Sequence, residues 1–101
     1  MAVWSIDIKP GNPATFVAQI QNAPPGTLYA DPGDLVSWNN MTNQTHDISV
    51  FAGSGVSGVV TPNHQTAAYT VSDGATTYTC TRHPNEKGVI LAGSANRPPQ
   101  A

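Results

Sequence analysis

The sequence predicts an all-β protein, built as a two-sheet Greek-key β-sandwich of about seven or eight strands. No window of helical length places apolar residues three and four positions apart. Instead, short runs that alternate apolar and polar residues are separated by turns, and the chain carries nine glycines and nine prolines. A length of 101 residues suits one domain, so we expect a single domain over 1–101, with 93–101 as a loose terminal tail.

The first half of the chain contains four predicted strands. Trp4, Ile6 and Ile8 share one parity, which predicts a strand over 4–8 with one apolar face. Trp38 shares its parity with a neighbouring apolar residue, Val36, so we expect it in the core. The other strands of this half are expected at 16–20, 27–30 and 35–38.

The second half places its cysteine and one of its histidines on predicted strands. His46 has the parity of Ile48 and Val50, and Cys80 has the parity of Tyr78, so both side chains are expected to face the interior. The strands are expected at 46–50, 67–71, 76–80 and 89–92, with a polar loop at 39–45 and a Gly/Ser-rich loop at 52–58.

Composition excludes several classes of function. Only four Lys and Arg residues are present and the net charge is -2, which argues against a nucleic-acid binder. No apolar stretch approaches the roughly 18–20 residues that a bilayer-spanning segment needs. Cys80 is the one cysteine, so an internal disulfide is excluded and a core or a metal must stabilise the fold.

Cys80 and His83 form the most informative motif. Cys80 ends a predicted strand, and His83 follows three residues later across a tight turn, so a thiolate and an imidazole can converge on one ion. His46 begins another inward-facing strand upstream. One cysteine and two histidines form the trigonal ligand set of a mononuclear copper site.

Three segments give the chain a resemblance to the cupredoxins, the family of small blue-copper electron carriers. They are GDLVSWNN at 33–40, THDISV at 45–50 and TYTCTRHP at 77–84. The resemblance extends over most of the chain and is strongest to short-loop members such as amicyanin and plastocyanin. It implies a copper ion bound by His46, Cys80 and His83, and a hydrogen bond to the thiolate from the backbone N–H of Asp47.

Glu86 departs from that pattern. It occupies the position, three residues after His83, where the resembled family carries a weakly bound axial methionine, and neither Met1 nor Met41 matches that position. A carboxylate is a hard anionic donor, so as a ligand it favours Cu(II), lowers the potential and shifts the colour toward green or red. The alternative is a solvated loop carboxylate beside Lys87 that leaves the metal three-coordinate or bound to water.

These residues predict a non-enzymatic one-electron carrier that uses one copper ion and serves a redox partner protein. The alternative is a copper site with an open or carboxylate-bound position that binds or converts nitric oxide or peroxide. Two other functions, a metal-free interaction module and a copper-delivery protein, account less well for the combination of Cys80 with two histidines. Zinc suits the same donors and is expected only as a contaminant. We expect a monomer in the periplasm or another extracytoplasmic compartment, with its native leader absent from this chain, and His64 as an exposed turn histidine.

Overall fold

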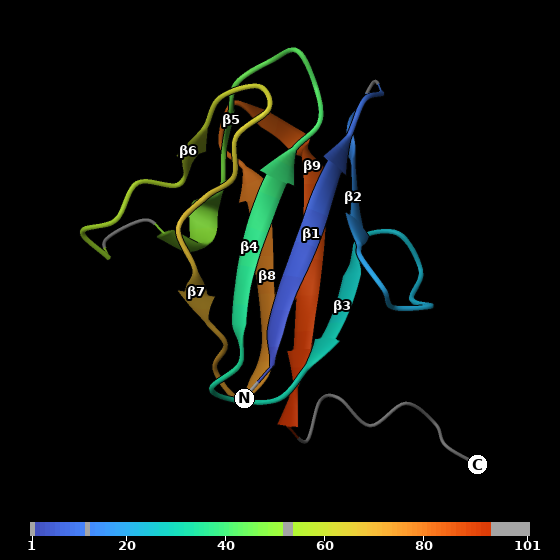
Figure 1. Cartoon of the computed structure of the whole chain (residues 1–101), viewed down its shortest axis with the longest axis vertical. Helices are drawn as coiled ribbons and strands as arrows, with labels where there is room; N and C mark the ends of the chain where they lie inside the picture. Colours follow the sequence, from blue (N-terminus) through green and yellow to red (C-terminus); the bar gives the residue numbers. More distant parts are fainter. Residues whose placement is uncertain (1, 12, 52–53, 94–101) are drawn as a thin grey trace.

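A computed structural model describes residues 2–11, 13–51 and 54–93 of the chain (Figure 1). Within these residues, the secondary structure consists of β-strands and one short 3₁₀ helix, η1. The elements are β1 (Val3–Lys9), β2 (Thr15–Ala18), β3 (Thr27–Ala30), β4 (Leu35–Asn40), β5 (His46–Asp47), η1 (Ser49–Phe51), β6 (Val59–Val60), β7 (Tyr69–Thr70), β8 (Gly74–Cys80) and β9 (His83–Ala92). None of the described helical residues forms a helix long and apolar enough to cross a membrane.

Two sheets face each other, which confirms the predicted β-sandwich. One sheet has the order β2-β1-β4-β7 and the other has the order β3-β9-β8, while β5 and β6 form a short separate ladder. Figure 1 shows β1 and β4 lying in front of β8 and β9. The parallel pairs β1·β4 and β3·β9 join strands that are distant in sequence, while the other pairs of these two sheets are antiparallel, so both sheets are mixed.

Aromatic side chains fill the space between the sheets. Trp38 and Tyr78 are buried and meet edge to face, with ring centroids 5.1 Å apart, and Phe16 meets Tyr78 in the same manner at 4.9 Å. Gly88 lies opposite Tyr78 in the β8–β9 register. A Cβ atom at Gly88 would lie 2.2 Å from the tyrosine ring, so this position must be glycine for the ring to lie flat on β9.

The prediction of a strand over 46–50 is wrong in its second half. β5 ends at Asp47, and Ser49–Phe51 turn into η1 because Phe51 N–H bonds back to the Ile48 carbonyl while Ser49 Oγ accepts from Thr79 N–H. The strand Val59–Val60 was not predicted, since two residues give no alternating pattern. β2 ends at Ala18 rather than at residue 20, and β4 runs on to Asn40, into the expected polar loop.

The last strand begins at His83, six residues before the position expected from its apolar run at 89–92. The register between β8 and β9 shifts at one point, with Thr79 opposite Lys87 and Cys80 opposite His83. Residues 84–86 therefore form a bulge on β9 with no partners on β8. The expected tail at 93–101 falls, from residue 94 on, outside the described residues.

Candidate metal centre

Four potential ligands meet at the end of the sandwich where β5 lies, opposite the marked N-terminus (Figure 1). His46 begins β5, Cys80 ends β8, His83 begins β9 and Glu86 lies in the β9 bulge. One donor atom from each lies within 4.8 Å of the donor atoms of the others. All four residues predicted as ligands are thus brought together by three separate segments.

The distances between donor atoms suit a small cation. Glu86 Oε1 lies 3.0 Å from His46 Nδ1 and 3.5 Å from His83 Nδ1, and Cys80 Sγ lies 3.5 Å from His83 Nδ1. Glu86 is only 4% exposed, so it is not a solvated loop carboxylate. The side chain of His83 is 36% exposed, which leaves one edge of the cluster open to solvent.

Two buried atoms of this cluster lack hydrogen-bond partners. His46 Nδ1 and Glu86 Oε1 face each other at 3.0 Å without a hydrogen bond between them, and no other group in the described structure bonds to either. Buried polar atoms are nearly always paired, so two unpaired acceptors that converge are suited to binding a cation. The donor set of two imidazoles, a thiolate and a carboxylate fits copper or zinc.

His46 is oriented from behind by Thr42. The Thr42 hydroxyl lies 2.9 Å from His46 Nε2 and also donates to Asn40 Oδ1 at 2.7 Å. With Nε2 occupied as a donor, Nδ1 is left to present its lone pair to the cluster. Burial lowers the pKa of His46, and the neighbouring Glu86 charge opposes this effect only in part. The ring is therefore neutral at pH 7, as a ligand must be.

Cys80 is held by the strand that carries His46. The backbone N–H of Asp47 points to Cys80 Sγ at 3.4 Å, the contact that the sequence resemblance implied. Thr81 secures this arrangement, because its backbone N–H donates to the Asp47 carbonyl and its hydroxyl donates to Asp47 Oδ2, both at 2.9 Å. A thiolate that accepts an N–H is stabilised in its charged form.

Glu86 is also held by a group that the sequence did not predict. The backbone N–H of Ala14 donates to Glu86 Oε2 at 3.1 Å, in a buried contact between residues 72 positions apart. A backbone amide leaves no signal in a sequence, so only the fold reveals this contact.

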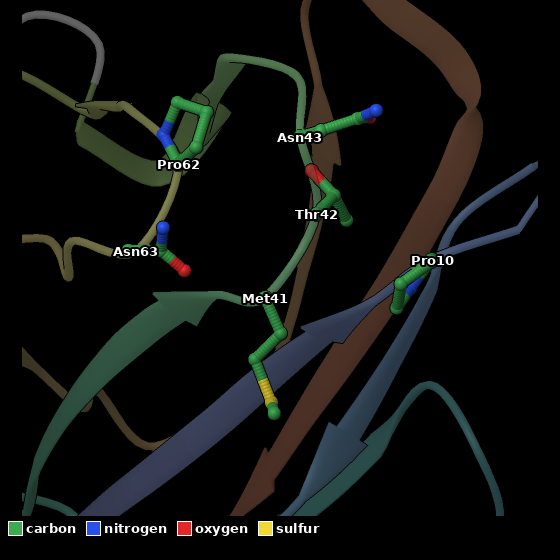
Figure 2. Close-up of a pocket in the computed structure, with 6 residues that line it drawn as sticks. All are labelled: Pro10, Met41, Thr42, Asn43, Pro62 and Asn63. Carbon is green, nitrogen blue, oxygen red and sulfur yellow. The ribbon is translucent and has the colours of Figure 1, made fainter.

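The remaining candidates lie away from the cluster. Met41 is half-exposed and lines an open hollow of about 440 Å³, with Pro10 and Pro62 around it (Figure 2). His64 is exposed in its turn, as predicted, where Nδ1 lies 2.9 Å from the Pro62 carbonyl oxygen. Trp4 is only partly buried at the core edge, whereas Trp38 is fully buried as expected.

Comparison with solved structures supports the fold. A methionine-to-alanine variant of amicyanin in its Cu(I) form superposes with a TM-score of 0.62 at 22% identity, covering 91% of this chain and 82% of that one. A methionine-to-glutamine variant in the Cu(I) form gives a TM-score of 0.63 at 21% identity, covering 91% and 83%. No family model matches the sequence, and no curated protein does either. The chain therefore has the cupredoxin fold.

Proposed function

We propose that this chain is a copper-binding protein that carries single electrons, with His46, Cys80, His83 and Glu86 as ligands. One observation carries the proposal. A cysteine, two histidines and a carboxylate converge in a cupredoxin fold, and the two unpaired atoms among them are 3.0 Å apart. A copper ion held there supplies one-electron chemistry between Cu(II) and Cu(I).

The protein contributes a rigid set of donors. His46 and Cys80 are fully buried, and each is fixed by a hydrogen bond. His46 Nε2 donates to the Thr42 hydroxyl, and the Asp47 N–H donates to Cys80 Sγ. Fixed ligands keep the geometry of the two oxidation states similar, which lowers the reorganisation needed for electron transfer. His83 is the partly exposed ligand, so its outer edge offers the shortest route to a partner protein.

Glu86 should set the potential. A buried carboxylate and a buried thiolate together cancel the charge of a divalent ion, whereas a monovalent ion leaves one net negative charge. Excess charge is costly in a low-dielectric interior. Glu86 therefore favours the divalent state, and we propose a low-potential carrier with a green or red colour.

Voltammetry of the copper-loaded protein tests this function. We expect a fast, reversible one-electron wave and an intense sulfur-to-copper absorption band, both abolished in Cys80→Ser. Ser49→Ala provides a control, because Ser49 contacts the β8 backbone near the site without being a candidate ligand. Copper that binds but cannot be cycled would overturn the electron-carrier proposal.

A small-molecule site is the second candidate. An open hollow of about 250 Å³ lies directly against His83 and Glu86, with Pro13, Arg82, Pro84 and Asn85 completing its lining. A diatomic or triatomic ligand such as nitric oxide, peroxide or azide fits this space. A change in the optical spectrum of the Cu(II) protein on adding azide would favour this candidate.

The setting of the protein follows from the proposed function. A carrier of this type works with a redox partner protein, and we propose an extracytoplasmic compartment such as the periplasm. We further propose that it acts as a monomer formed by a single domain. Zinc at the same donors would be a contaminant rather than the working metal.

A further inference from the structure

We propose that the backbone N–H of Ala14 is a latch that holds Glu86 on the metal and keeps small molecules out. The inference rests on the proposed role of Glu86 as a ligand. It bears on the choice between an electron carrier and a small-molecule site. A fixed Glu86 carboxylate would occupy the coordination position that a small molecule needs.

The two oxygens of Glu86 have separate tasks. Oε2 accepts the Ala14 N–H at 3.1 Å, while Oε1 faces His46 Nδ1 and His83 Nδ1. An oxygen that is already hydrogen-bonded to the backbone is a poor second metal ligand. The carboxylate is therefore set to bind through Oε1 alone, and rotation that would free Oε1 breaks the bond at Oε2.

Ala14 lies between β1 and β2, directly before Thr15, the first residue of β2. Ala14 is itself 5% exposed and belongs to the hydrophobic core, so its amide is fixed in position. A cleft of about 80 Å³ that reaches His46 is lined by this connection between β1 and β2, including Gly11 and Ala14.

The latch matters because the hollow beside His83 and Glu86 gives solvent a path to the cluster. Hydrogen bonds to charged groups are stronger than those between neutral groups, so losing this one should loosen the carboxylate appreciably. A loosened Glu86 can swing into the hollow, and the vacated position then accepts an anion. The presence of the amide thus favours a closed electron carrier over a small-molecule site.

Azide titration of the Cu(II)-loaded protein tests the latch, with optical and EPR spectra as readouts. We expect no spectral change in the unmodified chain, and azide binding strengthened by about tenfold or more in Ala14→Pro, which lacks the N–H. Ala14→Gly keeps the N–H and should respond like the unmodified chain. Equal azide responses in the unmodified chain and in Ala14→Pro would overturn the proposal.

Two further measurements separate this proposal from the one it rests on. If Glu86→Gln changes the Cu(II) spectrum while Ala14→Pro responds to azide no more than the unmodified chain does, the latch is wrong and Glu86 remains a ligand. If Glu86→Gln leaves the spectrum unchanged, both fail. If Ala14→Pro does not fold, amide hydrogen exchange of the zinc-loaded protein tests whether the Ala14 N–H is bonded to Glu86. The Ala14 amide should be protected and should lose protection in Glu86→Ala, and an unprotected amide in the unmodified chain contradicts the latch.

Discussion

Oε1 of Glu86 lies 3.0 Å from Nδ1 of His46, and neither atom has a hydrogen-bond partner in the described structure. Both residues are almost fully buried. Buried polar atoms without hydrogen-bond partners are unfavourable. A cation held between these two atoms, as proposed above, would remove this cost.

Replacing this carboxylate should stabilise the metal-free protein. In Glu86→Met the free energy of unfolding should rise by about 1 kcal/mol, because removing the buried, unpaired Oε1 outweighs the loss of the hydrogen bond from the Ala14 N–H to Oε2. Urea denaturation of the metal-free chain at neutral pH measures the change. A fall in the free energy of unfolding would show that Glu86 contributes to the fold without a metal.

The same substitution should raise the reduction potential. A neutral thioether favours the divalent ion less than a carboxylate does, and each tenfold change in relative affinity for the two oxidation states shifts the potential by about 59 mV. We expect an increase of about 60–120 mV, one to two such steps, measured by voltammetry. A potential that is unchanged or lower in Glu86→Met would contradict the assigned role of Glu86.

Thr42 should control metal affinity without touching the metal. Thr42→Val preserves shape but removes the hydroxyl that bonds His46 Nε2, and loss of such a partner weakens metal binding by about 10- to 100-fold. Competition with a chelator gives the affinity. Thr42→Ser keeps the hydroxyl and serves as the control, so equal losses in the two variants would assign the effect to packing.

Asp34 should make stability depend on acid pH. Burial acts to raise its pKa, but hydrogen bonds from the amides of Ala2 and Asp31 and from the Trp4 indole outweigh burial and lower the pKa below 3.8. The unfolded chain then binds a proton at a higher pH than the folded chain does. Asp34 therefore contributes its full stability above about pH 3.8, and loses it as the pH falls through the lower pKa of the folded state.

The NMR signals of the two tryptophan indole N–H groups can be used to measure the pKa of Asp34 in the folded state. The NMR signal of the Trp4 indole N–H should shift with a midpoint below pH 3.8, because that group donates to Asp34 Oδ2 at 3.0 Å. The Trp38 indole N–H has no hydrogen-bond partner in the described structure and serves as the internal reference. A midpoint above 3.8, or a Trp4 shift that persists in Asp34→Asn, would rule out this assignment.

Ile20 offers a stabilising substitution. It has a positive φ of 69° and is 98% exposed, so a β-branched side chain adopts a strained backbone conformation without gaining burial. Ile20→Asn should raise the free energy of unfolding by about 0.5–1 kcal/mol, since asparagine tolerates this conformation. Ile20→Val keeps the branch and should bring no gain in the same urea denaturation experiment.

Local patterns in the sequence predicted the sandwich and the pairing of Cys80 with His83. Glu86 entered the predicted ligand set only through the family resemblance. Alternation places Trp38 and Cys80 inside, and the three-residue spacing fixes Cys80 beside His83 across a turn. The bulge at 84–86 could not be predicted, since it arises from a register shift between Thr79 and Cys80 on the neighbouring strand. That bulge is what buries Glu86, which in sequence has the polar surroundings of a solvated turn.

The groups around the candidate ligands were predicted only in part. The N–H of Asp47 followed from the family resemblance, and the structure places it 3.4 Å from Cys80 Sγ. Thr42 and Ala14 reach the cluster through a hydroxyl in a polar loop and a backbone amide from a distant turn. Contacts of this kind depend on tertiary structure and have no local pattern.

The optical and EPR spectra of the Cu(II)-loaded protein, compared with those of Glu86→Gln, test the central claim most directly. We expect a sulfur-to-copper band shifted from the blue-copper position toward a green or red species, with a wide copper hyperfine splitting. Glu86→Gln should abolish this shift, because an amide is a weaker donor than a carboxylate. An ordinary blue-copper spectrum with narrow splitting, unchanged in Glu86→Gln, would contradict the claim that Glu86 binds the metal.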